Sequence, residues 1–140
     1  MRNEDQIYLQ LGQWLQSQHP KIPFHFDLGS GGVLTVGMAT RNKRMNPITG
    51  WPDFCLPVKR GDYSGLWIEI KTDDEVLIRP KDAKKILKDE TKLRLKGDWF
   101  NDHIEEQAEM LSELRKQGFC AVFGVGFDNC LKIINEYLKS

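Results

Sequence analysis

Asp53, Glu69 and Lys71 are the residues whose types and spacing point most directly to chemistry. Short apolar runs at 54–58 and 66–71 are separated by a polar loop that contains glycine, which predicts a β-hairpin. Because side chains alternate between the two faces of a strand, Glu69 and Lys71 lie on the same face. Asp53 opens the first strand, away from its apolar face. The hairpin therefore predicts a carboxylate pair beside an ammonium group.

Such a group suits a hard divalent cation. Mg²⁺ takes oxygen ligands and usually binds one or two carboxylates, while water and substrate phosphate complete its coordination. The cation lowers the pKa of a water and neutralises charge that develops on a phosphate. A neighbouring lysine holds the attacking water or stabilises the negative transition state. The alternative is a surface hairpin in which Glu69 and Lys71 form an ordinary ion pair.

The run Gly50-Trp51-Pro52-Asp53, followed by Glu69-Ile70-Lys71 and a later helical Gln107, resembles the PD-(D/E)XK nuclease superfamily. It is similar in particular to the VRR-NUC (virus-type replication-repair nuclease) family, from the first helix to about residue 127. The resemblance implies that Asp53 and Glu69 bind metal and that Lys71 is catalytic. The Ile70 carbonyl is a candidate further ligand.

Residues 3–18 are expected to form an amphipathic helix with an apolar stripe, and Glu4 continues that stripe toward the N-terminus. One interpretation is an acid in the first turn, where the helix dipole favours negative charge. The other is a third acid that points into the metal site. The family resemblance favours the second interpretation, because members often carry a glutamate at this place.

A second helix is expected over about 103–117, and Gln107 lies on its apolar face, between Ile104 and Leu111. A buried amide needs hydrogen-bond partners. Gln107 either bonds to a neighbouring backbone or reaches the Lys71 region or a metal-bound water. The resemblance implies the second role, so the expected catalytic residues are Asp53, Glu69, Lys71 and Gln107.

Formal charge is zero overall, but the charge is unevenly spread. Residues 79–96 carry a net charge of +5, and residues 101–140 carry −3. The basic segment at 79–97 is expected to be a helical insertion, either a solvated surface helix or a DNA contact. A second basic stretch precedes the hairpin and is either a solvated loop or a clamp on the phosphate backbone. The candidate DNA-binding residues are Arg41, Lys43, Arg44, Lys84, Lys85 and Lys88.

The chain has 140 residues, a length that suits a single domain over 1–140. It contains no apolar run long enough for a membrane span and no signal-peptide pattern. Its three cysteines lack metal-ligand spacing and are expected to be reduced thiols. Together with the phage origin of small VRR-NUC relatives, this predicts a cytoplasmic protein of a bacterium or a phage-infected cell.

A short strand is expected at 22–26, followed by a glycine-rich turn and a weaker apolar stretch at 33–38. Near the end, a buried strand at 119–125 precedes a final helix at about 128–139. The expected fold is α/β, with a restriction-endonuclease-like core in which a mixed central β-sheet is flanked by helices.

The expected function is hydrolysis of DNA phosphodiester bonds with Mg²⁺ or Mn²⁺. The resemblance also implies a structure-specific endonuclease that resolves four-way (Holliday) junctions as a homodimer. Alternatives are a flap or duplex nuclease of the same family, a DNA-binding module without catalysis, and a protein-interaction domain whose basic and acidic halves pair.

Overall fold

The computed structural model describes residues 3–27, 35–75, 77 and 99–140. The predicted glycine-rich turn and the predicted helical insertion at 79–97 lie outside these residues. The elements, in chain order, are α1 (Asn3–Gln18), β1 (His25–Phe26), α2 (Val36–Met45), β2 (Phe54–Leu56), β3 (Leu66–Lys71), α4 (Asp102–Lys116), β4 (Cys120–Val125) and α5 (Gly126–Lys139).

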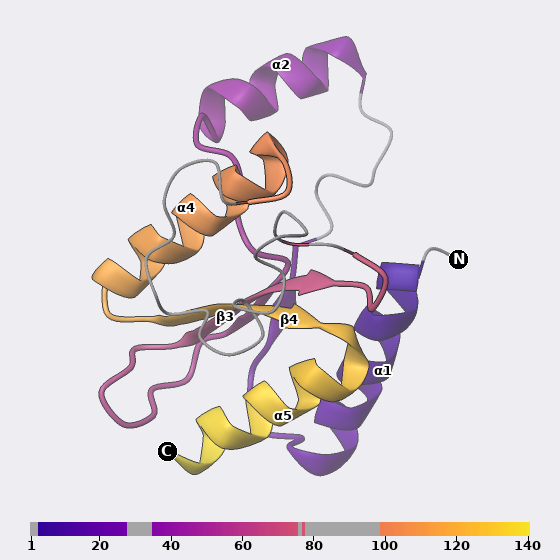
Figure 1. The fold of residues 1–140 in the computed structure, drawn as a ribbon, viewed down its shortest axis with the longest axis vertical. Helices are drawn as coiled ribbons and strands as arrows, with labels where there is room; N and C mark the ends of the chain where they lie inside the picture. Colours follow the sequence, from indigo (N-terminus) through magenta and orange to yellow (C-terminus); the bar gives the residue numbers. More distant parts are fainter. Residues whose placement is uncertain (1–2, 28–34, 76, 78–98) are drawn as a thin grey trace.

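The sheet is mixed and has the strand order β1-β2-β3-β4. β2 pairs with β3 in antiparallel fashion, as the hairpin prediction requires, and Phe54 lies opposite Ile68. β4 pairs with β3 in parallel, and Glu69 lies opposite Phe123. Because parallel neighbours need a crossover connection, α4 lies between them in sequence. It covers one face of the sheet, while α1 and α5 cover the other (Figure 1).

The two faces of β3 contact different helices. Leu66, Ile68 and Ile70 are buried in the cluster that α1 and α5 complete. The opposite face carries Trp67, which packs at the edge of the cluster formed with α4, and Glu69. The expected alternation is therefore confirmed, and it directs the polar side chains of β3 toward the α4 side.

The sequence-based boundaries hold for some elements and not for others. α1 and β4 match the prediction closely. β1 is only His25–Phe26, shorter than the strand expected at 22–26. α5 begins at Gly126, earlier than expected. Gly126 has φ +80, and a Cβ there would overlap the Asp73 carboxylate, so the start of α5 lies directly against the turn that follows β3.

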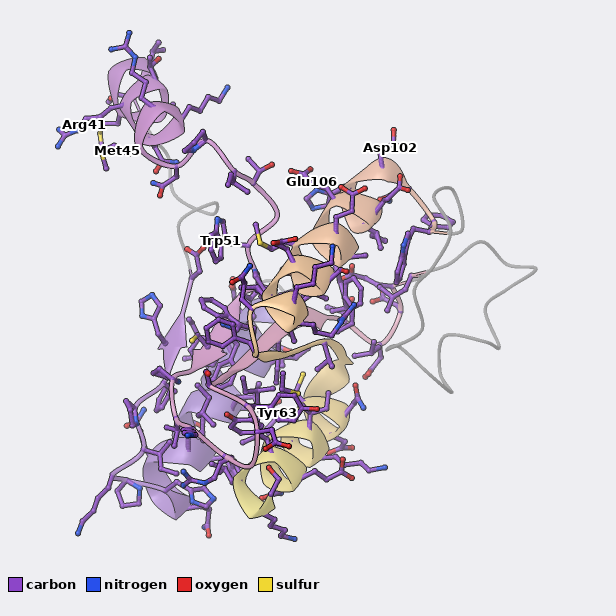
Figure 2. The ribbon with its side chains drawn as sticks, turned by 90° about the vertical axis from the view of Figure 1, so that its left-hand side faces the viewer. Arg41, Met45, Trp51, Tyr63, Asp102 and Glu106 are labelled. Carbon is purple, nitrogen blue, oxygen red and sulfur yellow. The ribbon has the colours of Figure 1, made fainter. Side chains whose placement is uncertain are left out.

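The basic stretch before the hairpin is helical where a loop was considered. Thr35 caps α2, since its hydroxyl oxygen accepts a hydrogen bond from the Met38 N–H at 3.2 Å. None of the residues of α2 is buried. The helix stands away from the sheet, beyond one end of α4 (Figures 1 and 2). It forms without an apolar face against the core, which is why periodicity did not predict it.

No helix among the residues described here has both the length and the apolar character needed to cross a membrane.

Candidate active site

The hairpin brings the carboxyl groups of Asp53 and Glu69 together. The antiparallel register places Asp53 one residue beyond the Phe54–Ile68 pair, across from Glu69. The Ile70 N–H donates to Asp53 Oδ2 at 2.9 Å, which fixes the aspartate against β3. The carboxyl groups of Asp53 and Glu69 are themselves within hydrogen-bonding reach. Two carboxyl groups in contact require a proton or a cation between them.

Burial makes this contact costly for two negative charges. Desolvation is the largest influence on Glu69 and, together with the neighbouring Asp53 carboxylate, raises the pKa of Glu69 to about 9. Burial also raises the pKa of Asp53, against the opposing effect of the hydrogen bond from Ile70. Both shifts favour the protonated forms, and a bound cation would favour the ionised forms instead.

Lys71 provides the positive charge that the fold places here. Its ammonium Nζ lies 3.8 Å from Glu69 Oε1 and 3.6 Å from Glu75 Oε2. The lysine side chain is only 6% exposed. A buried ammonium needs such partners, because losing them leaves an uncompensated charge. The two glutamates therefore hold the Lys71 ammonium beside the carboxyl pair.

Gln107 reaches the same cluster from α4. Its Nε2 donates to Glu69 Oε1 at 2.8 Å and lies 3.3 Å from His103 Nε2. The structure thus brings the Gln107 amide to Glu69, and the catalytic role of Gln107 stays a prediction. His103 precedes Gln107 by one helical turn and was not singled out from the sequence. The spacing of four residues was the available signal.

Glu4 lies at the edge of the cluster with two residues that sequence reasoning missed. Its carboxyl group hydrogen-bonds to Glu75, and burial, the largest cause, raises the pKa of Glu4. Tyr8 follows Glu4 by one helical turn and hydrogen-bonds to Asp53. Glu75 folds back toward Lys71 because its Oε1 accepts the Thr72 N–H at 3.1 Å. Neither the turn nor the helix–sheet docking was visible in the sequence.

The donor set fits a divalent cation that takes few protein ligands. Within the described ranges, no group of three or more His, Cys, Asp or Glu side chains is arranged to hold a metal ion. Two carboxylates are nevertheless the usual protein share of an Mg²⁺ site. Among the same residues, Glu69 Oε2 and Gln107 Oε1 are buried without a hydrogen-bond donor. Unsatisfied buried oxygens are costly and suit a cation or its water.

The predicted DNA-binding residues fall into two groups. Arg41, Lys43 and Arg44 are exposed on α2, and no acid accompanies them in that helix. Lys84, Lys85 and Lys88 lie outside the described residues. Ile70 is buried on the opposite face of β3, and its carbonyl stays a predicted ligand. Glu4 likewise stays a predicted ligand.

The sequence matches no family model and no curated protein. The fold is similar to a solved structure described as a VRR_NUC domain protein, with a TM-score of 0.64 and 26% sequence identity. That likeness covers 99% of this chain and 90% of the other. The mixed sheet with flanking helices is accordingly a restriction-endonuclease-like α/β fold, and the chain is similar in fold to a VRR_NUC domain protein over nearly its whole length.

Proposed function

We propose that this protein is a divalent-metal-dependent DNA endonuclease whose active site is the cluster around Glu69. The observation that carries the proposal is the buried contact among Asp53, Glu69, Lys71 and Gln107. The Gln107 amide and the Lys71 ammonium both meet Glu69 Oε1, at 2.8 Å and 3.8 Å. A stabilising role alone does not account for this group, since well-packed apolar residues stabilise an interior at least as well.

Asp53 and Glu69 would hold Mg²⁺ or Mn²⁺, with the Ile70 carbonyl and Glu4 as further ligands. The cation supplies positive charge at the scissile phosphate and acidity to a nearby water. Asp53 is kept in place by the Ile70 N–H. Gln107 fixes the orientation of Glu69 through its hydrogen bond.

Lys71 is the residue that acts on the attacking water in this proposal. Its ammonium is held between Glu69 and Glu75, so it cannot swing freely into solvent. From that position it orients the water and stabilises negative charge as the phosphate is attacked. Gln107 and Glu75 position the groups that do this work.

For the substrate, we propose DNA with a branch, in particular a four-way junction cut by a homodimer. The exposed basic residues of α2 would contact phosphates, which position a nucleic acid without reading its sequence. Lys84, Lys85 and Lys88 would add to that contact. A two-fold symmetric dimer would place its active sites for paired nicks. Such a protein would act in the cytoplasm of a bacterium or a phage-infected cell.

The decisive experiment incubates the purified protein with Mg²⁺ or Mn²⁺ and end-labelled four-way junction, flap, duplex and single-stranded DNA. We expect metal-dependent nicks, most of them in the junction. Lys71→Ala should lower the cleavage rate by about 10²–10⁴-fold and leave the fold and DNA binding intact.

The matched control is Lys116→Ala, since Lys116 also pairs with a glutamate but is 69% exposed. It should cut like the unaltered protein. Retained turnover in Lys71→Ala would contradict the assigned role of the lysine. Absence of cleavage of every substrate with either metal would contradict the proposed function, and a preference for flap or duplex DNA would replace the junction as substrate.

A further inference from the structure

Trp51 is a large aromatic residue that the proposed chemistry leaves unused. It lies two residues before Asp53, and its side chain is 44% exposed. In Figure 2 it lies between α2 and the main body of the molecule, on the segment that leads into β2. Exposed apolar surface often marks a place where a protein contacts a ligand or a partner.

The surroundings of Trp51 hold it in place. Gly50 has φ +86, and a Cβ there would lie 3.1 Å from the Glu106 carbonyl oxygen, so the chain runs directly against α4. On the other side, Pro52 is fully buried and Asp53 is hydrogen-bonded to Ile70. The backbone that carries the indole is therefore packed on both sides, although the indole itself is open.

The indole is also the outer member of a row of aromatic rings. Its ring centre lies 5.7 Å from that of Trp67, on the face of β3 that carries Glu69. Trp67 in turn contacts Phe119 edge-on, with centres 6.2 Å apart. Aromatic pairs at such separations prefer tilted geometries and support one another. Trp51 is thus a supported aromatic surface, two residues before Asp53 in the chain and in contact with a residue on the Glu69 face of β3.

We propose that Trp51 stacks on an unpaired nucleobase next to the phosphate that is cut. This inference rests on the proposed nuclease function and narrows its substrate to DNA with an unstacked base at the cleavage site, as at a branch. Stacking on an aromatic side chain accepts any base, since every base has a π face. The site would therefore select DNA shape and not sequence.

The charges on either side favour a base as the group that contacts Trp51. α2 presents Arg41, Lys43 and Arg44, which attract phosphates. The start of α4 presents acidic residues, among them Asp102 and the Glu106 that contacts Gly50. Figure 2 shows Trp51 between these two regions. A strand held there keeps its backbone toward α2, so its uncharged base is the part that reaches the indole.

The test measures DNA binding without metal, so that it does not depend on cleavage. Oligonucleotides that form a four-way junction carry 2-aminopurine at successive positions around the branch, and fluorescence is recorded on titration in EDTA. We expect quenching at one position with the unaltered protein and its loss with Trp51→Leu. We also expect Trp51→Leu to weaken binding about tenfold, while Trp51→Phe keeps most of the affinity.

Two controls separate stacking from other roles of the indole. Tyr63 has the same exposed fraction, 44%, but lies far from Trp51 in the β2–β3 loop, so Tyr63→Leu should bind normally. The dependence of affinity on salt should stay unchanged in Trp51→Leu, because no phosphate contact is lost. Thermal unfolding of Trp51→Leu and Trp51→Phe checks that the fold persists.

The inference is overturned if Trp51→Leu is folded and matches the unaltered protein in affinity and in 2-aminopurine signal. It is also overturned if Trp51→Leu dissociates a dimer, since the indole would then contact a second copy. These outcomes differ from failure of the proposed function. If the unaltered protein cuts no DNA but Trp51→Leu loses the quenching, stacking holds and catalysis fails.

Discussion

The site on β3 and the helix α2 differ in whether their polar side chains are buried or exposed. At the site, Glu69, Lys71 and Gln107 are all buried and depend on one another for hydrogen bonds and charge. In α2 no residue is buried, and the basic side chains Arg41 and Lys43 extend into solvent. One region buries groups that prefer water, and the other exposes a helix that lacks a core contact.

The difference in burial suits the two regions to different expected roles, catalysis at the β3 site and DNA binding by α2. Buried polar groups are costly unless they are fully satisfied, so the candidate site on β3 fixes the arrangement of its polar groups at a cost in stability. An exposed basic helix contributes little to folding and is free to bind a polyanion. We therefore expect substitutions at the site to affect turnover, and substitutions in α2 to affect DNA affinity.

Gln107→Leu tests the expectation that substitutions at the β3 site lower turnover. Leucine keeps the volume of the side chain but removes the donor to Glu69 Oε1, which lies 2.8 Å away. Substituting a group that orients a metal ligand costs about 10–100-fold in activity or metal affinity. We expect a loss of that size in turnover, measured over a range of Mg²⁺ concentrations, with unchanged DNA affinity.

Gln117→Leu is the matched control, because Gln117 caps the same helix and is exposed. It should leave turnover unaltered. If Gln107→Leu cuts as fast as the unaltered protein at every Mg²⁺ concentration, Gln107 does not position Glu69 for catalysis.

Charge reversal in α2 should affect binding instead. Replacing Arg41, Lys43 and Arg44 together by glutamate should weaken DNA binding about tenfold or more at low salt and flatten the dependence of affinity on salt. Since α2 buries no residue, the melting temperature should stay the same. Binding is measured by anisotropy at several salt concentrations, and turnover at saturating DNA should be retained. An unchanged salt dependence would show that α2 does not contact phosphates.

The pH dependence of stability should show a smaller effect of the buried carboxyl pair. The pKa of Glu69 rises from 4.5 to about 9 in the folded protein. Between those values the folded state keeps a proton that the unfolded state releases, so stability should fall as pH rises. In EDTA, we expect the melting temperature to decrease from pH 5 to pH 9, with a shallower decrease in Glu69→Gln.

Glu113→Gln serves as the comparison for that measurement, because the Glu113 side chain is 59% exposed and pairs with Lys116 at the surface. It should retain the pH dependence of the unaltered protein. Identical curves for Glu69→Gln and the unaltered protein would mean that Glu69 is ionised in the metal-free fold.

The hairpin and its polar face were predictable from the sequence, because alternation in β3 and the glycine-containing loop determine the register. The same holds for Gln107, whose place in an apolar stripe put it on the buried face of α4. These features follow from patterns within one element or between neighbouring ones. The family resemblance added the expected roles, and their direct test is mutational.

Two other kinds of feature were not predictable in this way: a helix without an apolar stripe, and contacts between elements that are separate in the sequence. α2 has no apolar stripe to reveal it, and its signals were Thr35 as a cap and Pro47 after its end. Glu75 reaches Lys71 only because the turn after β3 folds back. Tyr8 reaches Asp53 only because α1 docks beside the hairpin, which no local rule specifies.

Gly126 makes the geometry of the candidate site depend on a part of the chain that contains none of its proposed catalytic residues. Any side chain at that position would displace the Asp73 carboxylate, and with it the turn that presents Glu75 to Lys71. A search for impaired variants confined to the nuclease motif would overlook it. Mutational surveys of this protein should therefore find that Gly126, the first residue of α5, tolerates no other residue. The expected loss of DNA cleavage would come from the steric clash with Asp73.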